Sequence, residues 1–365
     1  MPQDPFEDYE RLRARGRVTY LEGRQTWAVT GFDEVSACLK NHGAFSSAIG
    51  AGGSGLGSSM IFADPPEHSR LRGVVAKAFT PRSIAALEGR INEIASQLLA
   101  GFDDEPFDVV SEYAIPLPIT VIAEMLGVDP ADRADFRRWS SAIVGRTFMD
   151  AATLRKEFGA YFGRVLEQRR ADPRDDLISG LVAANEEDVM TVDELLDAVA
   201  LLLVAGNETT TNLISLATLQ FARFRDQRDA ALRDLPNAIE EVLRYDGPVH
   251  MIPPRITRRE AKLGGEMIAA GSWVMLYIAA ANRDPERFVR PEVFDVTRTD
   301  AANHIAFGAG IHFCLGAPLA RLEGRVAMDA LLQHAPTYEL ADLPEEIVFQ
   351  PNAFLRTMER LEVVR

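Results

Sequence analysis

Apolar residues recur at helical spacing along most of the chain. Near the N-terminus Phe6, Tyr9 and Leu12 lie on one face of a predicted helix, which Gly16 ends. The same periodicity continues in later segments, namely 84–98, 116–126 and 154–170. The pattern therefore predicts a mainly helical protein.

One apolar helical segment is much longer than the others. Thr191 and Glu194 have the spacing of a capping box, in which two side chains satisfy backbone amides at a helix start. The apolar run that follows reaches about Phe224. Because so long and apolar a helix needs burial on most of its faces, it is expected to cross the middle of the molecule.

Another helix start is predicted at Asp64-Pro65-Pro66-Glu67. Asp64 has the side chain of an N-cap, and Pro65 suits a first helical turn. Glu67 stands where a capping box places its carboxylate. The preceding segment, 46–60, is rich in glycine and serine and is predicted to be a mobile surface loop.

Strand patterns are confined to short stretches. Residues 18–21 and 26–30 flank a turn, and a further β region covers 255–280, with a hairpin turn at Gly264-Gly265. No repeat, low-complexity linker or change of composition divides the sequence. We expect one domain over residues 1–365, mainly α with a small β portion.

Composition narrows the class of protein. The 365 residues carry a formal charge of −15, which argues against nucleic-acid binding because that function needs a concentrated basic surface. Two cysteines, Cys38 and Cys314, lack the spacing of a disulfide framework. The charged N-terminus lacks the apolar core of a signal peptide, and the apolar run 198–205 is too short to span a membrane. A cytoplasmic protein without membrane attachment is expected.

The strongest chemical signal surrounds the second cysteine, in residues 307–316 (FGAGIHFCLG). A lone intracellular cysteine is usually a buried thiol, but that explanation leaves the three glycines and His312 unexplained. Glycines around Cys314 allow a tight backbone turn, so that amide groups can point at the sulfur and stabilise a thiolate. The helix predicted for 317–325 would add the dipole of its N-terminus.

This stretch matches F-G-x-G-x-H-x-C-x-G, the haem-binding signature of the cytochrome P-450 family, which the chain resembles over nearly its whole length. The resemblance implies that haem b lies between the long central helix and the helix after the cysteine loop. It implies that Cys314 is the thiolate ligand of the iron, with Phe307 and Gly316 also at the cofactor. Such a ligand pushes electron density onto iron and favours O–O cleavage.

Residues 205–209 (AGNET), within the long helix, resemble the family motif [A/G]-G-x-[D/E]-T. Close helix packing alone would account for the small residues, but a glycine and a carboxylate in mid-helix cost stability. The Thr209 hydroxyl can bond to the carbonyl of Ala205 and open the helix locally. The resemblance implies that Ala205 lies at the haem and that Thr209 and Glu208 deliver protons to dioxygen, which needs an acid and an alcohol.

Haem carries two propionates, and buried carboxylates need cationic partners. His68 and Arg72 are four residues apart and face the same side of a helix. The run 64–72 resembles the family's third helix, in which this pair binds propionates. Arg255 and His312 match the other two propionate partners.

Glu241 and Arg244 are three residues apart on one helix face. An exposed pair of this kind would contribute little. Here they resemble the family's E-x-x-R pair, and the segment 294–298 resembles the one that supplies a second arginine, Arg298. The resemblance assigns all three to the structure behind the cysteine loop.

The substrate is expected on the opposite face of the haem from the cysteine. A hydrophobic small molecule, such as a terpenoid, steroid, fatty acid or macrolide precursor, suits the largely apolar lining that the family's layout implies. The residues concerned are the loop 46–62, Leu202, Ala205, the stretch Val249–Pro253 with Val249 and Ile252, and Phe354.

Electrons must come from outside, because the sequence has no flavin, iron–sulfur or dinucleotide motif. A ferredoxin or flavodoxin with its reductase is expected to dock on the cysteine side. Basic residues in the segments placed there would attract an acidic partner; they are Arg70, Lys77, Arg82, Arg321 and Arg325.

The expected activity is that of a monomeric haem-thiolate monooxygenase that inserts one atom of O₂ into its substrate, most simply by hydroxylation. Two alternatives remain at this point. One is a peroxide-driven haem-thiolate peroxygenase, and the other is a non-catalytic haem protein that senses a small molecule. Glu208 and Thr209 weigh against both, since neither function needs a paired acid and alcohol.

Overall fold

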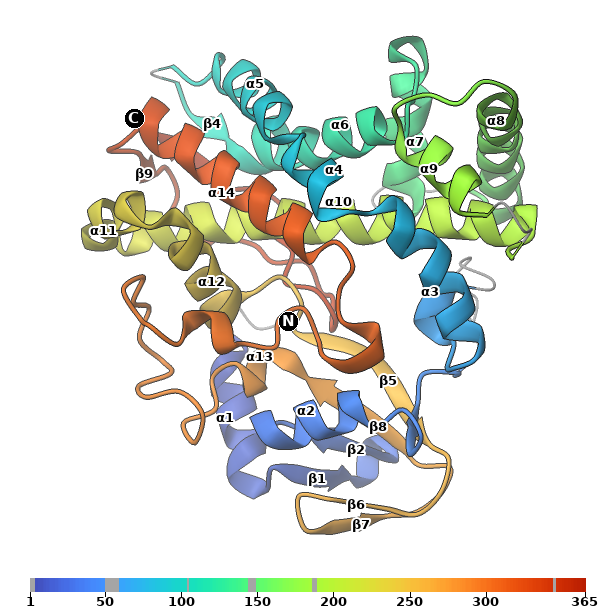
Figure 1. The fold of residues 1–365 in the computed structure, drawn as a ribbon. Helices are drawn as coiled ribbons and strands as arrows, with labels where there is room; N and C mark the ends of the chain where they lie inside the picture. Colours follow the sequence, from blue (N-terminus) through green and yellow to red (C-terminus); the bar gives the residue numbers. More distant parts are fainter. Residues whose placement is uncertain (1–3, 50–58, 104, 144–148, 186–188, 344–345) are drawn as a thin grey trace.

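The longest helix in the described part of the chain, α10 (Val192–Arg223), crosses the middle of the molecule (Figure 1). The computed structural model describes residues 4–49, 59–103, 105–143, 149–185, 189–343 and 346–365. Thr191 and Glu194 form the predicted capping box at the start of α10, and nearly every side chain from 210 to 222 is buried. The predictions of a central helix and of a mainly helical fold with a small β portion are confirmed.

The helices divide around α10 (Figure 1). Helices α5 to α9 lie on one side, whereas α1, α2 and the main sheet lie on the other, and α14 crosses α10 and packs against α5, α10 and α12. The helices other than α10 are α1 (Phe6–Arg15), α2 (Phe32–Lys40), α3 (Glu67–Ala78), α4 (Pro81–Ala85), α5 (Glu88–Leu99), α6 (Pro116–Met125), α7 (Arg133–Ile143), α8 (Ala151–Ala171), α9 (Leu177–Ala184), α11 (Arg228–Arg233), α12 (Leu235–Asp246), α13 (Ile278–Ala281) and α14 (Ala317–His334).

The main sheet has the strand order β1-β2-β8-β5-β3. Strand β2 pairs in parallel with β8, and the other neighbours are antiparallel. A second sheet has the order β4-β10-β9, and β6 and β7 form the predicted hairpin. The strands are β1 (Val18–Leu21), β2 (Thr26–Val29), β3 (Phe45–Ser46), β4 (Phe107–Asp108), β5 (Met251–Thr257), β6 (Ala261–Leu263), β7 (Glu266–Ile268), β8 (Trp273–Tyr277), β9 (Glu339–Leu340) and β10 (Glu362–Val364).

The helix start predicted at Asp64 is wrong. Helix α3 begins at Glu67 without a side-chain cap. The Asp64 carboxylate instead accepts hydrogen bonds from the Ser46 hydroxyl, from the Ser47 amide at 3.1 Å and from Arg258 at 2.6 Å. A charged donor and two further donors outcompete the amides of a helix end, so Asp64 fastens the chain to the main sheet.

The loop predicted for residues 46–60 is shorter than expected at its N-terminal end. Ser46 belongs to β3, which pairs with β5, and both Ser46 and Ser47 are buried. Residues 59–62 are also ordered in the fold, with a short 3₁₀ turn at Met60–Phe62. Residues 50–58 of this predicted loop lie outside the described residues.

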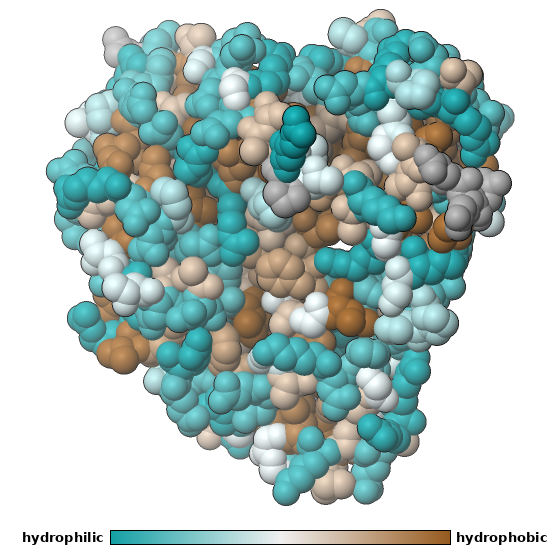
Figure 2. Space-filling model, in the orientation of Figure 1, coloured by the Kyte–Doolittle hydropathy of each residue, from teal (hydrophilic) through white to brown (hydrophobic). Residues whose placement is uncertain are grey.

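Helix α10 has the length and hydropathy of a membrane span, but its most apolar window is 61% buried inside the protein. Such a helix is better explained as the core of the fold. The visible surface in Figure 2 is mainly hydrophilic, with apolar residues gathered toward the centre of this face.

Close approach of α14 to α10 requires a glycine at position 324. A Cβ atom there would lie 3.0 Å from Cδ2 of Leu213 on α10 and 3.5 Å from Cγ2 of Ile239 on α12. Gly163 on α8 is also helical, but a Cβ atom there would meet nothing within 4 Å. Substitution of Gly163 by alanine therefore tests helix propensity alone, whereas the same substitution at Gly324 also tests packing between helices.

We predict that Gly163→Ala raises the free energy of unfolding by up to about 1 kcal/mol, because alanine is the better helix former. Gly324→Ala should lower it by about 1 kcal/mol, because the added methyl overpacks the contact with Leu213. Urea unfolding of both variants measures the difference. An equal gain in both variants would contradict the close-packing argument.

Candidate functional site

The cysteine loop is closed by its own backbone. The amide of Cys314 donates to the carbonyl of Phe307 at 2.9 Å. Gly308 and Gly310 have φ of 71° and 70°, in the left-handed region that favours glycine. A Cβ atom on Gly310 would lie 2.5 Å from the carbonyl oxygen of Leu39, so glycine is also required for the approach to α2.

Backbone amides surround the sulfur of Cys314. The amides of Gly316 and Ala317, at the N-terminus of α14, donate to it. Burial raises the pKa of the Cys314 thiol, while these two hydrogen bonds and the nearby Arg72 guanidinium act in the opposite direction. The residue is nevertheless exposed, because its side chain opens into a cavity. Among the described residues no backbone amide donates to the sulfur of Cys38, and its burial raises the thiol pKa to about 12.

A largely apolar cavity of about 280 Å³ separates the cysteine loop from α10. Every residue predicted to touch the cofactor lines it: His68, Arg72, Ala205, Arg255, Phe307, His312, Cys314 and Gly316. Thr209 lines it as well. Segments far apart in the sequence therefore meet around one space, with a thiol on one wall and the central helix on the other.

Four basic side chains meet at one part of this cavity. The rings of His68 and His312 are 4.3 Å apart between centroids, and the Nε2 atoms of both are buried without a hydrogen-bond partner. Arg255 is 5% exposed and donates to the carbonyl of Pro253 at 2.8 Å. Arg72 donates to the carbonyl of Phe313 at 2.6 Å.

The electrostatics of these four groups suit an anionic partner. Burial lowers the pKa of His68 and Arg255, and burial together with His68 lowers that of His312 to about 3. No carboxylate forms an ion pair with any of the four groups within the described residues. Buried cationic donors need anionic partners, and two propionates would supply them. The residues present thus fit haem, with its propionates here and its iron at Cys314.

The central-helix motif adopts the predicted hydrogen bond. The Thr209 hydroxyl donates to the carbonyl of Ala205 at 2.6 Å. The helix nevertheless continues unbroken through this point, contrary to the predicted local opening. Glu208 is half-buried and does not line the cavity, so it lies behind the surface on which Thr209 stands.

Asn207, at the variable position of the motif, has a structural contact that the sequence did not predict. It is buried, and its amide donates to the Ser140 hydroxyl at 2.8 Å. This bond ties α10 to α7 one residue before the acid–alcohol pair. The motif pattern leaves this position open, so only the fold could identify its partner.

A buried ion cluster holds the chain that leads to the cysteine loop. Arg244 contacts both carboxylate oxygens of Glu241, at 2.6 and 2.8 Å, and both side chains are fully buried. Arg244 also donates to the carbonyls of residues 282, 291 and 293. Arg298 lies 3.6 Å from Glu241 and donates to the carbonyls of residues 289 and 290. The cluster therefore fixes the irregular segment 282–298, and an exposed, weak pair is excluded.

Four of the residues predicted to lie on the substrate side line the cavity, and a fifth does not. Leu202, Ala205, Val249 and Ile252 line the cavity. Phe354 does not: its side chain is 40% exposed, and its carbonyl accepts from the amide of His250 at 2.8 Å. Further apolar lining residues that the sequence did not single out are Met60, Ile61, Phe79, Ile122 and Leu201.

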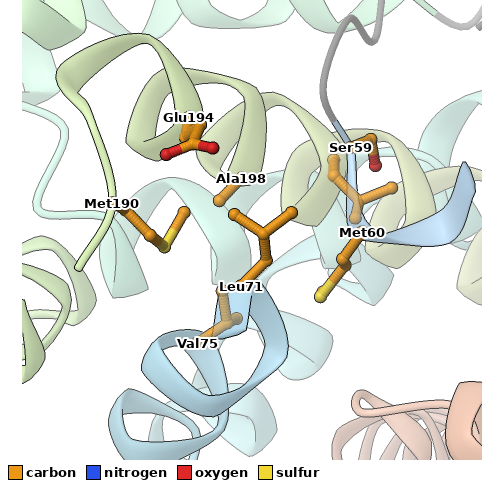
Figure 3. A pocket seen from close by; sticks show the side chains of 8 residues that line it. Ser59, Met60, Leu71, Val75, Met190, Glu194 and Ala198 are labelled. Carbon is orange, nitrogen blue, oxygen red and sulfur yellow. The ribbon is translucent and has the colours of Figure 1, made fainter. Parts of the chain in front are cut away.

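A side pocket of about 10 Å³ adjoins the cavity beside the first turns of α10 (Figure 3). Met60 and Leu201 line both spaces. The pocket is too small to hold more than a water molecule. It marks instead where α3, through Leu71 and Val75, packs against α10 and closes this side of the cavity.

Glu323 is a lining residue that the sequence analysis missed. It is 2% exposed on α14, hydrogen-bonds Thr210 of α10, and has no ion pair in the described chain. Burial raises its carboxyl pKa to about 8, although the Thr210 hydrogen bond opposes this. A carboxylate on the apolar face formed by Leu319 and Val326 was the available signal.

The raised pKa of Glu323 predicts that the stability of the fold declines as pH rises from about 4.5 to about 8. The folded protein holds this proton up to about pH 8, whereas an unfolded carboxyl releases it near its ordinary pKa of 4.5. The contribution is therefore complete below pH 4.5 and lost as pH rises through 8. The side chain in Glu323→Gln cannot ionise. The thermal-unfolding midpoint of this variant should therefore fall less than that of the wild type between pH 5 and 9. Glu93→Gln, on the exposed face of α5, should keep the wild-type pH profile; matching profiles for all three would refute the assignment.

Comparison with known proteins agrees with this geometry. The sequence profile of the family Cytochrome P-450 matches residues 224–346. The chain is 41% identical to the cytochrome P-450 monooxygenase PikC of Streptomyces venezuelae, over 99% of this chain and 91% of that protein. It is 44% identical to the vitamin D(3) 25-hydroxylase of Pseudonocardia autotrophica, over 83% of this chain and 77% of that protein.

The fold also matches solved structures. One is the crystal structure of CYP109E1 from Bacillus megaterium in complex with testosterone. The TM-score is 0.90 at 37% sequence identity, with 99% of each chain covered.

Proposed function

Because this chain belongs to the cytochrome P-450 family and is a monooxygenase of that family, we propose that it inserts one oxygen atom into a hydrophobic organic substrate, most simply by hydroxylation, with electrons from a separate ferredoxin or flavodoxin and its reductase. The observation that carries the proposal is one apolar cavity. On one wall lies Cys314, whose sulfur accepts hydrogen bonds from backbone amides, and on the other lies Thr209. We further propose that it works as a monomer in the cytoplasm.

The protein's own residues divide the work. Cys314 ligates the iron, and the amides of Gly316 and Ala317 stabilise its sulfur as a thiolate. The four basic residues at the cavity edge, His68, Arg72, Arg255 and His312, hold the propionates. Haem, when bound, supplies the redox chemistry that activates O₂.

Proton delivery falls to two neighbouring residues of α10. Thr209 presents its hydroxyl at the cavity, and its neighbour Glu208 is half-buried and does not line the cavity. The Thr209 proton bonded to Ala205 can turn toward a ligand in the cavity while Glu208 replenishes it from solvent. The same apolar lining excludes bulk water and so limits proton access to this route.

The substrate class follows from the lining. Leu202, Val249 and Ile252 offer only hydrocarbon, and the charged groups of the cavity are the ones assigned to the propionates and the buried Glu323. A neutral, largely hydrocarbon molecule fits these walls, since an unpaired charge would be costly there. The vitamin D and testosterone in the names of the similar proteins are molecules of this type.

The proposal is tested by separating O₂-dependent from peroxide-dependent turnover. The holoenzyme is given steroids, terpenoids, fatty acids and macrolide precursors, either with O₂, NADPH, a surrogate ferredoxin system and catalase, or with hydrogen peroxide alone. Thr209→Ala should cut product formation in the first regime by about 10²-fold, because the proton donor is lost. Thr209→Ser, which keeps the hydroxyl, is the matched control, and mass spectrometry measures the product.

The other outcomes separate the competing functions. Product formed chiefly from peroxide, with no effect of Thr209→Ala, would identify a peroxygenase. Absence of product in both regimes, with tight binding of a small ligand, would favour a sensor. Either result would contradict the monooxygenase proposal for this chain.

The structure narrows the proposed docking surface for the electron donor. Arg70 pairs with Glu194 at 2.5 Å, and Arg325 pairs with Glu88 at 2.6 Å. Arg321 pairs with Glu240 at 2.5 Å. Lys77, at the end of α3, and Arg82, on α4, are exposed and form no ion pair within the described residues. These two are the cations that remain available to an acidic partner.

We predict that Lys77→Glu with Arg82→Glu slows reduction of the haem by ferredoxin at least tenfold at low salt, because charge reversal removes electrostatic steering. The difference from wild type should shrink as salt rises, since exposed charges are then screened. Lys262→Glu, on the exposed hairpin strand β6, is the control. Stopped-flow absorbance measures the rate. Equal slowing by the control would show a net-charge effect without a docking site.

A further inference from the structure

A second carboxylate of α12 lies between the cysteine loop and α14. Glu240 is the neighbour of Glu241 but faces a different set of groups. Its Oε1 accepts from Nε of Arg321 at 2.5 Å, and its Oε2 accepts from Nη2 of Arg321 at 3.0 Å. The Nε2 atom of His304 lies 3.0 Å from the same Oε2. One carboxylate thus joins α12, α14 and the segment that enters the loop.

His304 connects Glu240 to the backbone at the start of the cysteine loop. Its Nδ1 accepts from the amide of Ala306 at 3.1 Å, so a ring proton resides on Nε2, which lies in electrostatic contact with Oε2 of Glu240 at 3.0 Å. The His304 side chain is 1% exposed, and it therefore has little freedom to turn. Ala306 immediately precedes Phe307, the first residue of the cysteine loop.

Arg321 connects Glu240 to the aromatic ring of Phe307. Its guanidinium lies 4.5 Å from the centroid of Phe307, within the range of a cation–π interaction. The carbonyl of Phe307 is the acceptor for the amide of Cys314. Glu240 therefore restrains Phe307 twice, through the backbone that precedes it and through its ring, and Phe307 in turn holds Cys314.

Stability alone does not account for this arrangement. A largely buried ion pair loses hydration, and the loss offsets much of the attraction between its members. Burial on its own would raise the pKa of Glu240, but hydrogen bonds from His304 and Arg321 lower it to about 2. The carboxylate is thus charged at neutral pH. The two hydrogen bonds from Arg321 to the Glu240 carboxylate fix the relative position of the two side chains, and a metal-ligand loop needs such precise positioning.

We propose that Glu240 is a positioning residue of the haem-ligand loop, which acts through His304 and Arg321 to fix Phe307 and thereby the electron donation of the Cys314 thiolate. The inference rests on the proposed haem-thiolate function. It assigns to Glu240 a role distinct from that of Glu241, which holds the segment 282–298 and makes no hydrogen bond to the loop in the described structure.

The test uses the holoenzyme and reads the iron ligand directly. Glu240→Gln keeps the size of the side chain but turns one acceptor into a donor, so either His304 or Arg321 loses its partner. A looser loop weakens the amide hydrogen bonds to the sulfur, which makes the thiolate a stronger and more basic donor. The haem reduction potential should shift to more negative values. The Soret band of the ferrous–carbonyl form distinguishes a thiol from a thiolate ligand, and the fraction with a thiol ligand should rise at least twofold. Haem should also transfer to an apoglobin roughly tenfold faster.

Two further variants keep the proposal falsifiable. Arg321→Lys retains the charge but loses the fork and the stacking on Phe307, so it should shift the potential in the same direction. Glu88→Gln removes the exposed ion pair with Arg325 on the same helix α14 and should leave the potential and the spectrum as in the wild type.

Wild-type potential and spectrum in both Glu240→Gln and Arg321→Lys would overturn the proposal, even if both variants were less stable, since a purely structural role predicts that result. A thiolate-type spectrum in the wild type, with these variants unaffected, would leave the monooxygenase proposal intact and refute only the positioning role. A wild type without thiolate ligation would instead refute the proposed function, and this inference with it.

Discussion

The sulfur of Cys314, held against an apolar cavity and proposed to be a thiolate, is the constraint on which the rest of this structure depends. An anion in such a place is stable only where donors replace its lost hydration. The amides of Gly316 and Ala317 provide them, and a backbone that can turn back on itself is required to aim them. The left-handed conformations of Gly308 and Gly310 and the closing bond from Cys314 to Phe307 follow from that requirement.

The same cavity keeps opposite charges in separate places. Its basic residues gather at one edge, where His68 and His312 leave ring nitrogens without partners. The buried carboxyl of Glu323, by contrast, is held in its neutral form near pH 7 and hydrogen-bonds across to α10. Buried basic groups of this kind are satisfied by an anionic partner, so this part of the cavity suits an anionic group. These features support the proposed haem site, with the apolar walls left for a substrate.

Sequence reasoning succeeded where chemistry is concentrated in a short motif and failed where partners come from distant segments. The residues of the 307–316 motif, the central helix and the Thr209 bond to Ala205 follow from local pattern and local hydrogen bonding. Asp64 has the features of a helix cap, but Arg258, 194 positions later, takes its carboxylate, and no local rule could show that. Phe354 lies off the cavity lining for a related reason, because the pairing of residues 248–251 with 354–356 sets which way each side chain points.

Helix geometry explains how α12 can serve two clusters with neighbouring residues. Successive residues of an α-helix project about 100° apart, so Glu240 and Glu241 cannot face the same group. Glu241 points to Arg244 and Arg298 and orders the segment 282–298, whereas Glu240 points to α14 and to the start of the cysteine loop. The segment 282–298 leads along the chain to Phe307 and Cys314, and α14 follows Cys314. A shift of α12 would therefore move both supports of the cysteine loop together, so in the proposed arrangement the position of the sulfur depends on a helix outside that loop.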